Sequence, residues 1–120
     1  MYCLDTYALW EIQFANEKFS NFLVDNFVVA DWTLAEFYRG LLRTYNEATA
    51  DYWLRKLRPS CRKVDIDTII KAARFQYTNK KANMSMYDTV GYIFAQENAL
   101  LFVTGDKEFK GREGVLFIQK

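Results

Sequence analysis

The sequence predicts an α/β fold, a parallel sheet with helices on both faces. Four short apolar runs are continuous rather than alternating, as in strands that are buried on both faces. Segments with helical periodicity lie between these runs, which favours strand–helix–strand units. The 120 residues include 51% hydrophobic side chains but only five glycines and one proline. This composition predicts one domain, residues 1–120, with a core of its own and no flexible linker.

The strands and helices are expected in a regular order along the chain. The predicted strands are Tyr2–Leu4, Phe27–Ala30, 100–103 and 115–118, with a fifth short strand near 63–65. Between them, apolar residues recur at positions i, i+3, i+4 and i+7. That spacing predicts helices over 34–45, 48–57, 66–77 and 87–95, the second of which stops before Pro59. The aromatic-rich segment 9–27 is expected to supply core and helix packing.

The residue counts exclude several classes of function. The chain has no histidine, which removes Ser-His-Asp and Cys-His catalysis and His-ligated zinc. Its two cysteines, Cys3 and Cys61, are expected to be free thiols in a reducing compartment. A formal charge of +1 indicates neither a nucleic-acid coat nor a membrane surface. No apolar run approaches the ~18 residues of a membrane span, so we expect a cytoplasmic protein without a membrane partner.

Acidic residues occupy the predicted strand ends and helix starts. Asp5 follows the first strand, and Asp106 follows the strand at 100–103. Glu36 and Asp88 lie near the starts of two predicted helices. Ligand sites in such folds lie beyond the carboxyl ends of the strands, where the strand order reverses. All four carboxylates can therefore lie on one edge of the sheet.

Three of these acids also have a purely structural explanation. Glu36 follows Thr33, and Asp88 follows Ser85, at the spacing of a capping box. Asp106 follows a glycine and fits an ordinary turn. Capping and metal binding are compatible, because helix N-termini orient side chains toward the same crevice.

Asp5 is harder to explain as a structural residue. An acid at the end of a buried strand needs a partner or an opposing charge to offset its desolvation. Four converging carboxylates would also repel one another and raise their pKa values. A hard divalent cation relieves both effects, and oxygen ligands without imidazole or paired thiolates point to Mg²⁺ or Mn²⁺. Such a site suits in-line attack of water on a phosphodiester.

Four segments carry the acids in a fixed order. They are Leu4-Asp5-Thr6-Tyr7-Ala8-Leu9, Thr33-Leu34-Ala35-Glu36, Ser85-Met86-Tyr87-Asp88 and Val103-Thr104-Gly105-Asp106-Lys107-Glu108-Phe109. This ordered set resembles the PIN domain, and most closely its short, prokaryotic, VapC-like members. The resemblance covers residues 1–120. The family usually has Ser or Asn two residues after the first Asp, where this chain has Tyr7.

The resemblance implies a three-layer α/β/α sandwich with a central parallel sheet of four to five strands. It also implies a Mg²⁺- or Mn²⁺-dependent ribonuclease that leaves 5′-phosphate and 3′-hydroxyl ends. The implied catalytic and metal-binding residues are Asp5, Glu36, Asp88 and Asp106, with supporting hydroxyls from Thr6 and Thr104. The partners implied are an RNA substrate, a second copy in a homodimer and a cognate antitoxin that holds a toxin inactive.

Basic residues gather in two places outside the acidic segments. Arg55 and Arg58 belong to one cluster, and Lys80 and Lys81 form the other. These side chains are candidates for contacts with RNA phosphates. Basic residues beside a helix end are also commonly just solvated, so both interpretations stay open.

Two other functions compete with a nuclease. One is a PIN-fold RNA-binding or scaffold module that retains the acids without cleaving. The other is a phosphotransfer domain with Asp5 as nucleophile. Haloacid-dehalogenase-like enzymes need a second acid two residues later, where this chain has Tyr7, so that hypothesis is weaker. No glycine-rich phosphate loop is present for a nucleotide cofactor.

Overall fold

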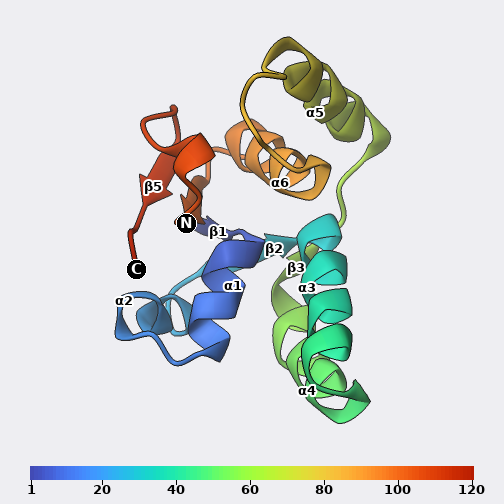
Figure 1. Cartoon of the computed structure of the whole chain (residues 1–120), viewed down its shortest axis with the longest axis vertical. Coiled ribbons are helices and arrows are strands. Elements are labelled where there is room, and N and C mark those ends of the chain that lie inside the picture. The colour runs from blue at the N-terminus through green and yellow to red at the C-terminus, as the bar shows by residue number, and fades with distance from the viewer.

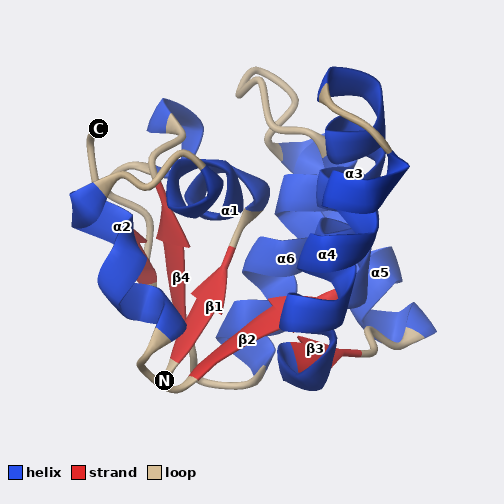
Figure 2. Cartoon of the chain, turned by 90° about the horizontal axis from the view of Figure 1, so that it is seen from below, coloured by secondary structure: helices blue, strands red, loops and turns tan.

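The computed structural model describes all of residues 1–120 and confirms the parallel α/β fold (Figure 1). Its strands are β1 (Tyr2–Leu4), β2 (Phe27–Ala30), β3 (Cys61–Arg62), β4 (Leu101–Thr104) and β5 (Val115–Phe117). They form one sheet in the order β3-β2-β1-β4-β5, and each neighbouring pair is parallel. Figure 2 shows β4, β1 and β2 side by side. The strand order reverses at β1, which lies between β2 and β4.

Helices cover both faces of the sheet, which confirms the three-layer α/β/α arrangement. One layer holds α1 (Thr6–Gln13), α2 (Glu17–Ser20), α3 (Asp31–Thr44) and α4 (Glu47–Leu57). The other layer holds α5 (Ile66–Thr78) and α6 (Met86–Glu97). Three short 3-10 turns complete the chain: η1 (Asn21–Leu23), η2 (Arg58–Ser60) and η3 (Lys107–Phe109). None of the helices combines the length and the apolar character that crossing a membrane requires.

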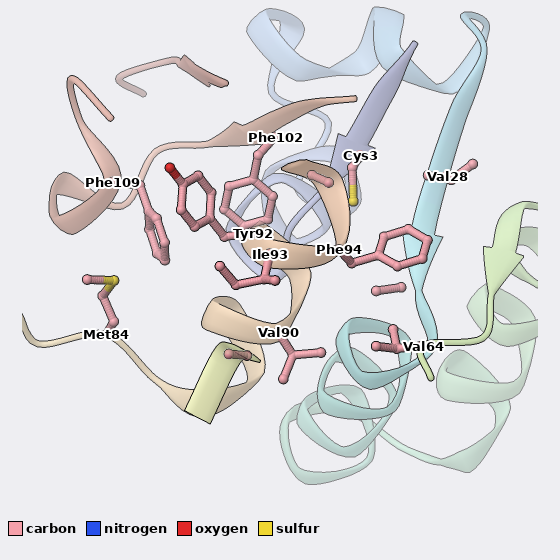
Figure 3. Close-up of a cluster of buried hydrophobic side chains, with 13 residues drawn as sticks. Cys3, Val28, Val64, Met84, Val90, Tyr92, Ile93, Phe94, Phe102 and Phe109 are labelled. Carbon is pink, nitrogen blue, oxygen red and sulfur yellow. The ribbon is translucent and has the colours of Figure 1, made fainter. Parts of the chain in front are cut away.

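Successive residues of each strand pack on opposite faces of the sheet, as the period of a β-strand dictates. Cys3 and Phe102 face α5 and α6, whereas Leu4 and Val103 face the layer of α1 to α4. In Figure 3 the ring of Tyr92 packs against Phe102, with ring centroids 5.7 Å apart. Burial on both faces is the reason that the strands are continuous apolar runs rather than alternating ones.

The fifth strand lies two residues earlier than the sequence predicts. A fifth strand is present as predicted, but β3 is Cys61–Arg62, and residues 63–65 lie outside it. Val64 lies beyond β3, and its backbone N–H donates to the carboxylate of Asp31 at 3.3 Å. A side chain from α3 therefore satisfies a group that a longer strand would have paired.

The remaining boundaries differ from the predictions by a few residues. The strand predicted over 100–103 lies one residue later, and the one over 115–118 ends one residue earlier. The helix predicted over 34–45 begins at Asp31, whose carboxylate accepts a hydrogen bond from the N–H of Trp32 at 2.8 Å. Thr33 is consequently inside α3 and buried, so the predicted capping box of Thr33 and Glu36 is wrong.

Gly91 allows α6 to lie close to both the sheet and α3. A Cβ atom at Gly91 would lie 3.2 Å from the Phe102 Cε1 atom and 3.2 Å from the Thr33 Oγ1 atom. The close packing draws the first turn of α6, which carries Asp88, toward the first turns of α3, which carry Glu36.

The aromatic core beneath α1 and α3 supplies a stability prediction. Phe37 is fully buried, and its ring centroid lies 5.2 Å from Trp10 and 6.1 Å from Trp53. We expect Phe37→Ala to lower the free energy of unfolding by about 3–5 kcal/mol, measured by urea denaturation. The control Phe14→Ala removes a ring that is 57% exposed and should cost no more than about 1.5 kcal/mol. Equal losses in the two variants would contradict this assignment of the core.

Candidate functional site

The four predicted acids lie at the carboxyl edge of the sheet, where the strand order reverses. Asp5 directly follows β1, and Asp106 follows β4 by two residues. Glu36 projects from α3, and Asp88 belongs to the first turn of α6. A cleft of about 450 Å³ lies between these elements and is lined by Thr6, Tyr7, Glu36, Asp88, Gly105, Asp106 and Lys107. Asp5 is buried beside this cleft.

Local capping orients three of the four acidic segments. Asp5 is the N-cap of α1, where its Oδ1 atom accepts a hydrogen bond from the Ala8 N–H at 2.8 Å. Asp106 caps η3 by accepting from the Glu108 N–H at 3.0 Å. The hydroxyl of Ser85 caps α6 by accepting a hydrogen bond from the Asp88 N–H at 3.0 Å, as the sequence predicts. Capping and convergence on one cleft therefore occur together.

Asp5 is the most constrained of the acids. Only 1% of its surface is exposed, and its Oδ2 atom has no hydrogen-bond partner. Burial, followed by the negative charge of Asp88, raises the pKa of Asp5 well above its usual range. Hydrogen bonds from the Thr104 hydroxyl and the Ala8 N–H oppose that rise only in part. The unpartnered Oδ2 atom therefore calls for either a proton or a cation.

Asp88 is perturbed by the same gathering of charge. Burial raises its pKa to about 7, with further contributions from the nearby negative charges of Glu36 and Asp106. The hydrogen bond from Ser85 lowers this pKa but does not offset the rise. Asp5 and Asp88 thus experience the negative field of neighbouring carboxylates, as the sequence predicts for acids that converge.

The two threonines predicted as supporting hydroxyls both contact the acids. The Thr6 hydroxyl donates a hydrogen bond to the Glu36 Oε1 atom. The Thr104 Oγ1 atom accepts from the Asp106 N–H at 3.0 Å, and the Thr104 hydroxyl also lowers the pKa of Asp5. The first bond fixes the carboxylate of Glu36, and the second fixes the turn that carries Asp106 after β4.

The residues of the cleft fit a hydrated divalent cation better than a closed metal cage. No group of three or more acidic or cysteine side chains is arranged to hold a metal ion alone. The unpartnered Asp5 Oδ2 atom and the mutually repelling carboxylates nevertheless provide an oxygen-only donor set. Mg²⁺ commonly takes one or two carboxylates and keeps several waters. Asp5 and Asp106 could supply the direct ligands, with Glu36 and Asp88 acting directly or through water.

The basic residues singled out in the sequence lie away from the cleft. Arg55 and Arg58 precede β3, so they lie toward the amino ends of the strands, opposite the acids. Lys80 and Lys81 belong to the turn between α5 and α6, and neither lines the cleft. The cation that does line it is Lys107, which sequence reasoning missed. Its position directly after the last acid of the set is the signal that could have found it.

A larger cavity of about 630 Å³ lies at the opposite edge of the sheet. Met1 and Leu100, which precede β1 and β4, contribute to its lining together with Phe94 of α6. It contains no carboxylate, so it shares none of the chemistry of the acidic cleft.

Comparison with known proteins identifies the fold. No model of a known protein family matches the chain, and no curated protein sequence matches it either.

A toxin–antitoxin complex from Klebsiella pneumoniae contains a chain that is 16% identical, with 100% of both chains covered and a TM-score of 0.78. VapC20 of Mycobacterium tuberculosis, described as a sarcin-ricin loop cleaving toxin, is 14% identical. The match covers 100% of this chain and 98% of VapC20, with a TM-score of 0.79. DNA-bound VapBC from Salmonella typhimurium contains a chain that is 19% identical over 98% of this chain and 96% of its own, with a TM-score of 0.73. The chain therefore has a VapC-like fold.

The raised pKa of Asp88 predicts how stability depends on pH. A carboxyl with a pKa of 3.8 in the unfolded chain and about 7 in the fold binds its proton more tightly when folded. Its contribution to stability is therefore lost as the pH rises from about 4 to about 7. In the absence of metal, Asp88→Asn should be more stable than wild type at pH 8 by about 1 kcal/mol or more, and the difference should vanish near pH 4. Urea denaturation across this pH range measures it, and a difference that is independent of pH would contradict the assignment.

Proposed function

We propose that this protein is a Mg²⁺- or Mn²⁺-dependent endoribonuclease. The observation that carries the proposal is the buried, unpartnered Asp5 Oδ2 atom close to Asp88 and Asp106, with Glu36 in turn close to Asp88. A fold that only needed helix caps would have no reason to bring four carboxylates to the same edge of the sheet, because their mutual repulsion is unfavourable without a cation. The location at the strand-order reversal is where open α/β sheets bind their ligands.

In this proposal Asp5 and Asp106 are the main metal ligands, and Glu36 and Asp88 complete the set. When bound, the cation would offset the charge of the carboxylates, activate water and stabilise the charge on a phosphodiester under in-line attack. The oxygen of water would form the new bond to phosphorus as the bond to the 3′ oxygen breaks. The products would be a 5′-phosphate and a 3′-hydroxyl.

The hydroxyls of the cleft hold the ligands in place. Thr6 donates to one oxygen of Glu36 and leaves the other oxygen free to bind. Thr104 accepts a hydrogen bond from the backbone N–H of Asp106 and lowers the pKa of Asp5. Each carboxylate so fixed loses less side-chain freedom when it binds a ligand.

The biological role that we propose is the toxin of a toxin–antitoxin pair. The VapC-like fold supports it, since VapC20 is described as cleaving the sarcin-ricin loop and other chains of this fold occur in toxin–antitoxin complexes. In this role the chain would act on RNA in the cytoplasm, form a homodimer and be held inactive by a cognate antitoxin.

A second candidate is a PIN-fold module that binds RNA without cleaving it. One observation favours it: no three of the acids are arranged to hold a metal ion by themselves. The two candidates differ in what metal does, because a binding module would bind RNA without cutting it when Mn²⁺ is added.

Metal binding tests the ligand assignment before any substrate is known. Isothermal titration of Mn²⁺ should detect binding to wild type, and Asp5→Asn and Asp106→Asn should each abolish it while leaving the fold intact. Asp25→Asn is a matched control, because it changes one charge just before β2, at the opposite edge of the sheet. Binding retained in both site variants would refute the assignment.

Cleavage of end-labelled structured RNA tests the activity. We expect wild type to cut with Mn²⁺ or Mg²⁺ and not with EDTA, and Asp106→Asn to lose at least about a hundredfold in rate, since a bound cation stabilises the transition state by several kcal/mol. Cutting that persists in EDTA or in Asp106→Asn would count against a metal-dependent nuclease. A folded wild type that binds Mn²⁺ and RNA but never cuts would favour the binding module.

A further inference from the structure

Another cavity, also of about 450 Å³ and distinct from the larger one at the opposite edge of the sheet, adjoins the acidic cleft. The two share Tyr7, Gly105 and Lys107 in their linings. The second cavity, which we call the lysine groove, continues along Lys110 and Lys120 and has no acidic residue in its lining. The acidic cleft and the lysine groove therefore meet at the side chain of Tyr7.

Two of the three lysines in the groove have no carboxylate partner. Lys107 and Lys110 are exposed and form no ion pair, whereas Lys120 lies 3.7 Å from the Glu11 Oε2 atom. The Lys110 Nζ atom lies 5.4 Å from the ring centroid of Phe117. Ammonium groups left unpaired along one groove attract a polyanion more strongly than scattered, paired ones do.

Tyr7 is held firmly between the two compartments. A Cβ atom at Gly105 would lie only 2.2 Å from the Tyr7 Cε1 atom and 2.5 Å from Cζ, so the ring occupies the space that a glycine leaves open. The Phe19 ring supports Tyr7 from within the core, with centroids 6.1 Å apart. The Lys120 Nζ atom lies 5.9 Å from the Tyr7 centroid. The ring is thus a fixed aromatic surface beside cations.

The acidic cleft alone is poorly suited to hold RNA. Its carboxylates repel phosphates, and one bound divalent cation offsets only part of that charge. Most affinity for a nucleic-acid backbone comes from cations that contact phosphates, and aromatic rings add stacking that tolerates any base. The groove next to the cleft provides both kinds of group within reach of the same strand.

We propose that the lysine groove is the subsite for the nucleotide that flanks the cut phosphodiester in single-stranded RNA. This inference rests on the proposed function. The phosphate of the flanking nucleotide binds Lys107 and Lys110, and its base or ribose packs against the ring of Tyr7. Tyr7, where the resembling family usually has Ser or Asn, is here the residue that joins the acidic cleft to the groove.

Binding of a short, fluorescein-labelled single-stranded RNA, followed by anisotropy over a series of salt concentrations, tests this subsite. The binding buffer contains Ca²⁺ in place of the Mn²⁺ used for cleavage, so that the acidic cleft still holds the charge of a divalent cation. A gel verifies that the RNA stays intact. Lys107→Gln/Lys110→Gln should weaken binding and lower the magnitude of the salt slope by about 1 to 1.5, because each phosphate contact with a single strand contributes ~0.7. Arg55→Gln/Arg58→Gln removes the same charge at the opposite edge of the sheet and should leave the slope unchanged.

The ring of Tyr7 is tested separately. Tyr7→Leu should weaken binding by roughly fivefold or more, the loss of one stacking contact, while Tyr7→Phe should bind like wild type. Thermal melting of both variants checks that the packing against Gly105 survives. The lysine variants carry the test if Tyr7→Leu is unstable, because both lysines are exposed.

The outcomes separate this inference from the nuclease proposal. An unchanged salt slope in Lys107→Gln/Lys110→Gln, equal losses in the control pair, or no binding by wild type would overturn the subsite even if the protein cuts RNA. Binding that depends on the lysines and on the ring would support the subsite even if no RNA is cut.

Discussion

Burying a carboxylate at the end of β1 costs free energy that the surrounding structure has to offset. Asp5 is 1% exposed, and only one of its oxygens is engaged by the cap of α1. Desolvation of that kind is tolerated when a proton or a cation neutralises the charge. Burial of the neighbouring Cys3, followed by the charge of Asp5, raises the pKa of that thiol to about 12. The elements that meet at Asp5 are arranged around this one unsatisfied group.

Helix capping and the acidic site are two uses of the same residues. The order β3-β2-β1-β4-β5 brings the ends of β1 and β4 together, and Asp5 and Asp106 cap the helical turns that follow those strands. Helix N-termini carry partial positive charge that favours nearby carboxylates. That charge is insufficient here, because the pKa of Asp88 still lies at about 7. The remaining negative field is what a divalent cation would neutralise, and what a lysine groove would offset for a bound RNA.

Signals that are local in the sequence predicted most of the fold and the placement of the four acids at one edge of the sheet. Continuous apolar runs mark strands buried on both faces, and acids directly after them mark the edge where ligands bind. Features made by distant segments were not predictable in this way. The N–H of Val64, just after β3, donates to Asp31 on another element, and the lysine groove is lined by Lys107 and Lys120 from different segments. Runs of basic residues such as that around Arg58 carry no information about which edge of the sheet they occupy.

The position of a bound Mn²⁺ ion is the most direct test of the proposed metal site. Crystals of the protein grown or soaked with Mn²⁺ would locate the ion by its anomalous scattering. We expect a single strong peak, or a close pair, in the acidic cleft within coordination distance of the Asp5 Oδ2 atom and of the Asp106 carboxylate. A cleft without a peak at saturating Mn²⁺, or a peak bound only by other residues, would contradict the proposed metal site.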